Sequence, residues 1–187
     1  MEIRDELKIK VMDGVYKPEE DSYLLIKSIR LDGKKALDMG CGCGIVALHL
    51  AKNGCDVTAV DINEKAVENT KINAKINELN LKCFKSNLFE NIKEKFDLIV
   101  FNPPYLPTKN EDIAWDGGKN GKEVIEKFLK EAKNYLSEEG VIYMVMSSFN
   151  KPDKIIKKFK EYNFEKISEK KFFFETIYVY KIKIKFS

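Results

Sequence analysis

Three alternating glycines follow a short apolar run near the start of the chain. Residues 35–39 read Lys-Ala-Leu-Asp-Met, and Gly40, Gly42 and Gly44 come directly after them. Glycine allows a sharp backbone turn and the close approach of a ligand. A buried strand, a glycine turn and an apolar helix in this order predict the first unit of an open parallel sheet, in which ligands bind at the carboxyl ends of the strands.

The rest of the chain alternates between apolar runs typical of strands and stripes typical of helices. The expected strands are 35–39, 57–60, 81–85, 97–101, 140–146, 164–171 and 173–185, and the expected helices are 19–31, 45–52, 64–76, 122–136 and 152–162. This order predicts an α/β fold with a seven-stranded, mostly parallel, doubly wound sheet and helices on both faces. Lysines alternate with apolar residues over 181–186, which indicates that the C-terminal strand has one wet face and runs antiparallel.

Length and composition limit the other classes of protein. The 187 residues suit one domain over 1–187, with residues 1–31 forming an N-terminal segment and helix. No apolar run approaches the ~18 residues that cross a bilayer, and the first residues hold no apolar leader, which favours the cytoplasm. A net charge of +3 indicates no polybasic surface for nucleic acid. The cysteine spacing is not that of zinc knuckles, so no metal site is expected and the thiols are interpreted as small buried side chains: Cys41, Cys43, Cys55 and Cys83.

An acidic residue closes the second expected strand. Asp61 follows the run 57–60, about twenty residues after the glycine loop, where a carboxylate can accept hydrogen bonds from both hydroxyls of a ribose. The loop lacks the G-x-x-x-x-G-K-[ST] pattern of a P-loop, and its G-x-G-x-G spacing differs from the dinucleotide pattern G-x-G-x-x-G. The two features together therefore predict a nucleoside ligand of another kind.

The pattern Asp38-x-Gly40-x-Gly42-x-Gly44, followed by Asp61, resembles class I S-adenosylmethionine-dependent methyltransferases. The resemblance implies a Rossmann-like fold that ends in an antiparallel strand. It implies S-adenosyl-L-methionine as the cofactor, with S-adenosyl-L-homocysteine as its product. In that family the glycine loop passes the methionine moiety and the acid holds the ribose.

The tetrapeptide Asn102-Pro103-Pro104-Tyr105 directly follows the fourth expected strand, at the same sheet edge as the glycine loop. Two consecutive prolines fix the backbone in an extended form, which can aim the Asn102 amide and nearby carbonyls at one point. The tetrapeptide resembles the motif of methyltransferases that act on planar NH2 groups: adenine N6, cytosine N4 or glutamine N5. The resemblance implies that Asn102 and the carbonyl of Pro103 accept the two N–H bonds of the acceptor, while Tyr105 packs on its planar group.

Two further segments narrow the choice of acceptor. Residues 15–25 and 114–123 resemble those of the HemK-like protein-glutamine N5-methyltransferases, in the short archaeal and eukaryotic branch that acts on class I release factors. In that branch the first segment covers the cofactor, and its hydroxyl residue, here Ser22, contacts it. These resemblances imply three groups of site residues. The cofactor residues are Tyr16, Pro18, Glu20, Ser22, Asp38, Gly40, Gly42, Gly44, Asp61, Ile62, Asn87, Leu88 and Asn102; the catalytic residues are Asn102, Pro103 and Tyr105; and the substrate residues are Asn102, Pro103, Pro104, Tyr105 and Trp115.

One position departs from the family pattern. After the third strand the family usually has Asp-Leu, with the acid near the adenine amino group, whereas this chain has Asn87-Leu88. The amide oxygen of Asn87 can still accept a hydrogen bond from that group, but the usual charge is missing. The single histidine, His49, falls inside the helix after the glycine loop and is interpreted as structural.

The predicted function is methyl transfer to glutamine N5 in the Gly-Gly-Gln tripeptide of a class I release factor. The alternative is adenine N6 methylation of RNA or DNA, which shares the tetrapeptide but normally needs a basic groove. Lysine methylation fits less well, because an ammonium group must first lose a proton. A non-catalytic binding module is disfavoured by the intact tetrapeptide. The resemblance also implies a small zinc-binding activator that covers an apolar sheet edge, unless the lysine-rich final strand protects its own edge.

Overall fold

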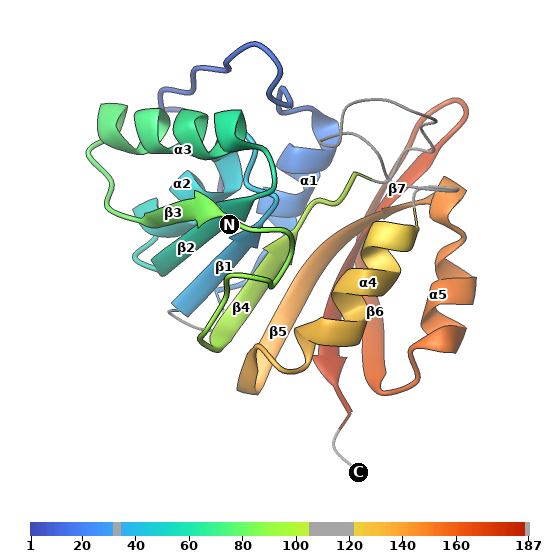
Figure 1. The fold of residues 1–187 in the computed structure, drawn as a ribbon. Helices are drawn as coiled ribbons and strands as arrows, with labels where there is room; N and C mark the ends of the chain where they lie inside the picture. Colours follow the sequence, from blue (N-terminus) through green and yellow to red (C-terminus); the bar gives the residue numbers. More distant parts are fainter. Residues whose placement is uncertain (32–34, 105–121, 186–187) are drawn as a thin grey trace.

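The computed structural model describes residues 1–31, 35–104 and 122–185. Seven strands form one sheet in the order β3-β2-β1-β4-β5-β7-β6 (Figure 1). Their bounds are β1 Lys35–Met39, β2 Asp56–Asp61, β3 Lys82–Lys85, β4 Phe96–Phe101, β5 Leu136–Ser147, β6 Tyr162–Lys171 and β7 Thr176–Ile184. The first five strands pair in parallel, and β7 runs antiparallel to both β5 and β6. The predicted sheet, with its antiparallel C-terminal strand, is therefore confirmed.

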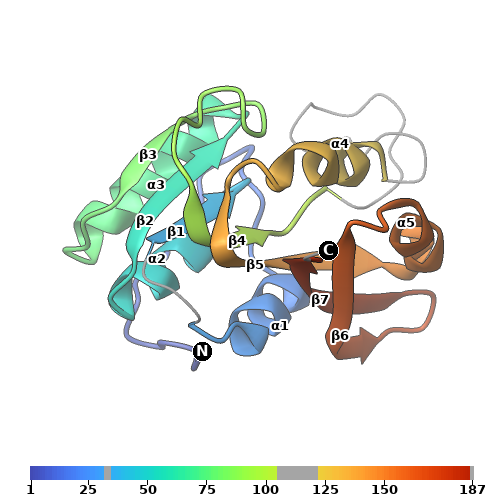
Figure 2. The same cartoon turned by 90° about the horizontal axis from the view of Figure 1, so that it is seen from below.

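Helices cover both faces of the sheet, as predicted. They are α1 Glu20–Ser28, α2 Ile45–Lys52, α3 Glu64–Ile76, α4 Glu123–Ala132 and α5 Pro152–Lys158, with a short 3₁₀ turn, η2, at Ser148–Asn150. One apolar core lies beneath α1, α2 and α3, and a second lies beneath α4 and α5. Figure 2 shows α1 and α4 on opposite sides of the central strands. In the described ranges, no helix has the length and apolarity needed to cross a membrane.

The central strands are buried on both sides because of this double cover. In β4 and β5 the apolar residues form continuous runs, which is typical of parallel strands with helices on each face. Helix α4 presents Ile125, Phe128, Leu129 and Ala132 to the core, the spacing of one helical face. The sheet is thereby held rigid, with the carboxyl ends of β1, β2 and β4 at one edge.

Five predicted boundaries are wrong by three or four residues. Helix α1 ends at Ser28 rather than 31, and β5 begins at Leu136 rather than 140. Helix α4 ends at Ala132 rather than 136, because Leu136 pairs with Phe96 as the first residue of β5; its spacing from Ala132 fits a helix equally well. Helix α5 ends at Lys158 rather than 162, because Tyr162 begins β6 by pairing with Ile184.

The fifth wrong boundary is at the last strand, which begins at Thr176 rather than 173. The N–H of Phe172 donates to the carbonyl of Glu175 over 2.7 Å and closes a hairpin turn there. The lysine-rich strand is also not an edge strand as expected: β7 lies between β5 and β6, so β6 forms that edge.

Residues 1–14 form an extended segment that passes over α3, and we call this segment the strap (Figure 1). Asn69, Asn73 and Asn77 lie four residues apart on one face of this helix, and their side-chain amides hydrogen-bond the backbone of residues 8–12 at 2.7–3.0 Å. Four residues along a helix advance about as far as two residues along an extended chain, so each amide lies opposite a backbone group. The strap leads into the segment that precedes α1.

Candidate active site

The glycine loop turns under the carboxyl ends of β1 and β2. The N–H groups of Gly40 and Cys41 both donate to the carbonyl of Val60, at 2.8 and 2.9 Å. Gly42 and Gly44 have φ values of 55° and 85°, in the left-handed region that side chains rarely adopt. A Cβ on Gly44 would lie 2.9 Å from the Thr70 side chain, whereas one on Gly42 would meet no atom within 4 Å. Gly44 is thus a packing glycine, and Gly42 faces open space.

Two carboxyl groups brace this loop. The buried Asp38 accepts a hydrogen bond from the N–H of Ala47 at 3.0 Å, and burial raises its pKa to about 8, with the nearby charge of Asp61 acting in the same direction. Asp61 accepts from the N–H of Gly42 at 3.0 Å and of Asn63 at 2.8 Å. Burial also raises the pKa of Asp61, and these backbone hydrogen bonds oppose that rise.

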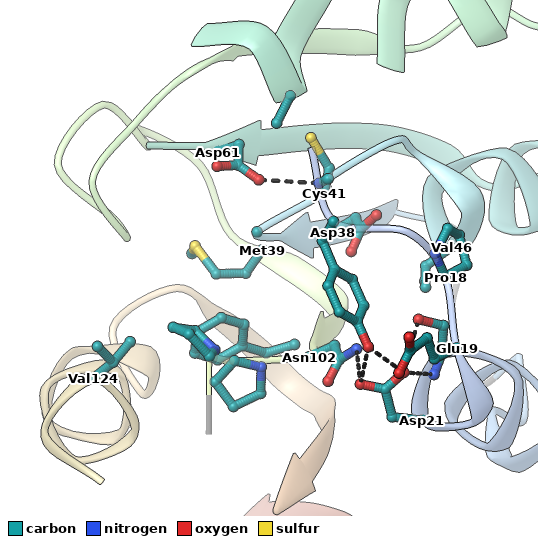
Figure 3. A pocket seen from close by; sticks show the side chains of 18 of the residues that line it. Pro18, Glu19, Asp21, Asp38, Met39, Cys41, Val46, Asp61, Asn102 and Val124 are labelled. Carbon is teal, nitrogen blue, oxygen red and sulfur yellow. Dashed lines mark hydrogen bonds between the residues drawn. The ribbon is translucent and has the colours of Figure 1, made fainter. Parts of the chain in front are cut away.

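Asn102 lies across the cavity from the glycine loop (Figure 3). Its side-chain Nδ2 donates to Oδ2 of Asp21 at 3.1 Å. Its Oδ1 is buried and has no hydrogen-bond partner among the described residues. Since an unpaired buried oxygen is costly, this atom is a candidate acceptor for an N–H group of a ligand.

Asp21, at the start of α1, accepts several hydrogen bonds. Its carboxylate accepts from the Tyr16 hydroxyl at 2.9 and 3.0 Å, from the Ser22 N–H at 2.6 Å and from the Asn102 amide. Burial, followed by the Asp21 charge, raises the pKa of Tyr16, so this hydroxyl keeps its proton and remains a donor. Asp21 therefore fixes which way the Asn102 amide is turned.

A cavity of about 950 Å³ joins these groups, which is large enough for a nucleoside cofactor and part of a second ligand. Most of the residues predicted for the site line it. They are Tyr16, Pro18, Glu20, Ser22, Asp38, Gly40, Gly42, Asp61, Ile62, Asn87, Leu88, Asn102, Pro103 and Pro104. Gly44 does not line it, for the packing reason given above. Tyr105 and Trp115 lie outside the described residues.

Several lining residues were not predicted from the sequence. Asp21 was missed because an acid in the first turn of a helix usually faces water, although its spacing to the buried Leu25 places it on the apolar face. From β6 to β7, Phe172, Phe173, Phe174 and Glu175 also line the cavity, as does Phe149 of η2. No motif marks these positions, because only the fold of the hairpin brings them to the site.

The charge of the cavity is strongly one-sided. Among its described lining residues, seven side chains are acidic and one, Lys127, is basic. A cationic or neutral ligand suits such a surface, and a polyanion does not.

The histidine and the cysteines are buried. His49 accepts from the N–H of Arg4 at 3.0 Å and contacts the carbonyl of Ile45 at 2.7 Å, while burial lowers its pKa. All four cysteines are free and buried, and burial raises the pKa of Cys43 to about 11. The predicted burial of the cysteines is confirmed, and the structural role of His49 stays a prediction.

The known proteins that this chain is similar to include methyltransferases. The family model described as "Methyltransferase small domain" matches residues 6–175. A putative protein N5-glutamine methyltransferase of Methanocaldococcus jannaschii is 41% identical over 168 residues, which are 85% of each chain. The catalytic subunit of the eRF1 methyltransferase of Schizosaccharomyces pombe is 32% identical over 184 residues, 80% of this chain and 79% of that protein.

Two solved structures have a similar fold. The Mtq2–Trm112 complex of E. cuniculi, which methylates the termination factor eRF1, contains a chain that matches with a TM-score of 0.76 and 26% identity, over 91% of this chain and 99% of that one. The T. thermophilus 16S rRNA methyltransferase RsmC, solved with AdoMet and guanosine, matches with a TM-score of 0.71 at 23% identity, over 92% of this chain and 45% of that one. The second likeness shows the fold alone.

Proposed function

The chain belongs to the methyltransferase small-domain family, and from that premise we propose that it methylates glutamine N5 in the Gly-Gly-Gln tripeptide of a class I peptide chain release factor. The observation that carries the proposal is the buried Oδ1 of Asn102, which has no hydrogen-bond partner in the part of the chain that the structure describes. Relatives named as glutamine and eRF1 methyltransferases support the choice of acceptor.

The cavity fits S-adenosyl-L-methionine. Gly42 leaves open space where a side chain would stand, Asp61 offers a carboxylate for ribose hydroxyls, and the acidic lining suits a cationic cofactor. We assign the cofactor to the glycine loop, Asp38, Asp61, Ile62, Asn87 and Leu88, with Tyr16, Pro18, Glu20 and Ser22 covering it. When bound, it supplies an electrophilic methyl group and leaves as S-adenosyl-L-homocysteine, and the amide nitrogen releases one proton after the transfer.

The chain's own contribution is orientation of the acceptor amide. The lone pair of a primary amide nitrogen is delocalised, so the two N–H bonds must be held while it is turned toward the methyl group. Oδ1 of Asn102 and the carbonyl of Pro103 are the proposed acceptors of those N–H bonds, and Asp21 is a positioning residue that holds the Asn102 amide. Such orientation can supply ~7–11 kcal/mol in favourable systems. Tyr105 and Trp115 stay predicted acceptor contacts.

Adenine N6 methylation has less support from the site. Nucleic-acid binding normally depends on basic side chains that neutralise phosphates, and here the described lining holds seven acids and one lysine. We therefore keep this reaction as the outcome that the RNA arm of the experiment below tests.

A second subunit is part of the proposal. The S. pombe relative is named a catalytic subunit, and the E. cuniculi chain is in complex with Trm112. We infer that this chain also acts with a small activator subunit, of the zinc-binding kind, in the cytoplasm, where release factors function.

The test uses labelled S-adenosylmethionine with three acceptors: a class I release factor, the same factor with Gln→Ala in its tripeptide, and total RNA. We expect label in the unmodified factor alone, with mass spectrometry placing it on the glutamine. Label in the Gln→Ala factor would refute the acceptor, and label in RNA alone would favour the adenine reaction. If the factor stays unlabelled, the assay is repeated with the activator subunit present.

The Asn102→Ala variant tests the chemistry. Losing one positioned acceptor at the transition state costs ~2.7–4 kcal/mol, which is roughly a hundredfold to a thousandfold in turnover. Cofactor affinity should change far less. Near-normal single-turnover methylation by a folded variant would refute the proposed alignment.

A further inference from the structure

Three consecutive phenylalanines form the tip of the β6–β7 hairpin. Phe173 and Phe174 are 93% and 82% exposed, and their rings pack edge to face with centroids 4.6 Å apart. Phe172 and Phe149 are also exposed, at 42% and 40%. We call Phe172, Phe173 and Phe174 the aromatic tip.

Hairpin tips usually carry glycine, asparagine, aspartate or proline, and these residues favour the turn and stay solvated. The aromatic tip instead exposes large apolar surface, which carries an aggregation hazard unless something covers it. The tip also lines the same cavity as Asn102 and Pro103. A ligand whose reacting group reaches Asn102 can therefore also contact the tip.

From this continuity we infer that the aromatic tip binds the polypeptide that flanks the acceptor glutamine. The inference rests on the proposed function and adds a determinant of specificity to it. Aromatic side chains are enriched at the energetically dominant positions of protein interfaces, since they bury much area with few rotamers to fix.

Charges around the tip favour a polypeptide over anionic partners. The lysines of the end of β6 are paired with carboxylates: Lys166 and Lys171 with Glu169, and Lys170 with Glu20 of α1. Lys170 also lies over the Phe172 ring, 5.6 Å from its centroid. Glu175, next to the tip, adds a further acid to the cavity. An anionic lipid surface or an RNA would meet acids and paired lysines here.

The test is a Phe173→Ala/Phe174→Ala variant, assayed with the activator subunit if the wild type needs it. Because both side chains are exposed, the melting temperature should not change. We expect the KM for the release factor to rise at least tenfold, with kcat at saturating factor and the affinity for S-adenosylmethionine unchanged within about twofold. Ile72→Ala is the matched control, since Ile72 is an exposed apolar residue of α3 that does not line the cavity.

Each outcome decides the inference. An unchanged KM for the release factor overturns it, while wild-type turnover still upholds the proposed function. Wild-type protein that labels no release factor refutes the proposed function, and the inference fails with it. If the variant instead loses binding to phosphatidylcholine–phosphatidylglycerol vesicles or to RNA while its KM for the factor stays the same, the tip serves that other partner and the inference is wrong.

Discussion

Replacing Asp21 with Asn should lower turnover by releasing the Asn102 amide from its fixed orientation. The carboxylate of Asp21 accepts hydrogen bonds from Tyr16, Ser22 and Asn102. In Asp21→Asn one oxygen becomes an NH2 donor and faces one of these donors. The Asn102 amide then loses its fixed partner and can turn, which takes Oδ1 away from the acceptor.

The size of the effect follows from the kind of hydrogen bond lost. A hydrogen bond to a charged group contributes ~1.5–3 kcal/mol. If the Nδ2 bond to Asp21 is what holds Asn102 in its productive orientation, kcat should fall about tenfold to a hundredfold. The affinity for S-adenosylmethionine should change less, because only the covering residues Tyr16 and Ser22 lose a partner, while Asp61 and the glycine loop lie across the cavity.

Single-turnover methylation, calorimetry with S-adenosylmethionine and thermal melts on one sample separate these effects. Asp97→Asn is the matched control: Asp97 accepts from the Lys35 N–H at 3.1 Å and the Ser137 hydroxyl at 2.8 Å, and it does not line the cavity. This control should lower the melting temperature and leave turnover per folded molecule intact. A folded Asp21→Asn variant with wild-type kcat would show that Asp21 does not position Asn102.

Three more predictions concern the cofactor side of the cavity. Asp61→Ala removes a charged acceptor for ribose hydroxyls and should weaken S-adenosylmethionine binding at least tenfold in calorimetry; unchanged affinity would remove Asp61 from the site. Gly44→Ala should lower the melting temperature sharply through its clash with Thr70, whereas Gly42→Ala should cost only about 1 kcal/mol of backbone strain yet weaken cofactor binding; equal melting curves for the two would contradict the packing argument. Burial raises the pKa of Asp38 from 3.8 to about 8, so the folded state holds a proton that the unfolded chain releases, and the free energy of unfolding should fall as pH rises from about 4 to about 8. Asp38→Asn should flatten this pH dependence, because each unit of pKa shift corresponds to about 1.4 kcal/mol of unfolding free energy. Urea titrations at several pH values measure it, and an unchanged slope would show that Asp38 ionises normally.

The sheet and the cofactor side of the cavity were predictable because local pattern and motif agree there. A glycine loop after β1 and an acid after β2 sit at strand ends, and parallel topology alone brings strand ends to one edge. Asn102 follows for the same reason, since it comes directly after β4.

Features that depend on long-range packing were not predictable. The contact between Asp21 and Asn102 joins residues 81 positions apart, and nothing in either local pattern requires it. Phe173 and Phe174 were assigned to the last strand, and the turn that Phe172 and Glu175 close keeps them out of it. Leu136 fitted both a helix and a strand until its pairing with Phe96 decided the matter.

The hydrogen bonds between the asparagine side chains of α3 and the strap have a consequence for the order of folding. They join residues 8–12 to residues 69–77, so a loop of about sixty residues must close before any of them forms. The pairing of β1 with β4 closes a loop of similar length, but no side chain of residues 1–14 is buried, and segments with little buried apolar surface open more easily than core strands. The strap should therefore dock last and detach first. Because it leads into Tyr16 and Asp21, the newly made protein completes its sheet before its cofactor cavity acquires a cover, and partial unfolding opens that cavity while the sheet is still intact.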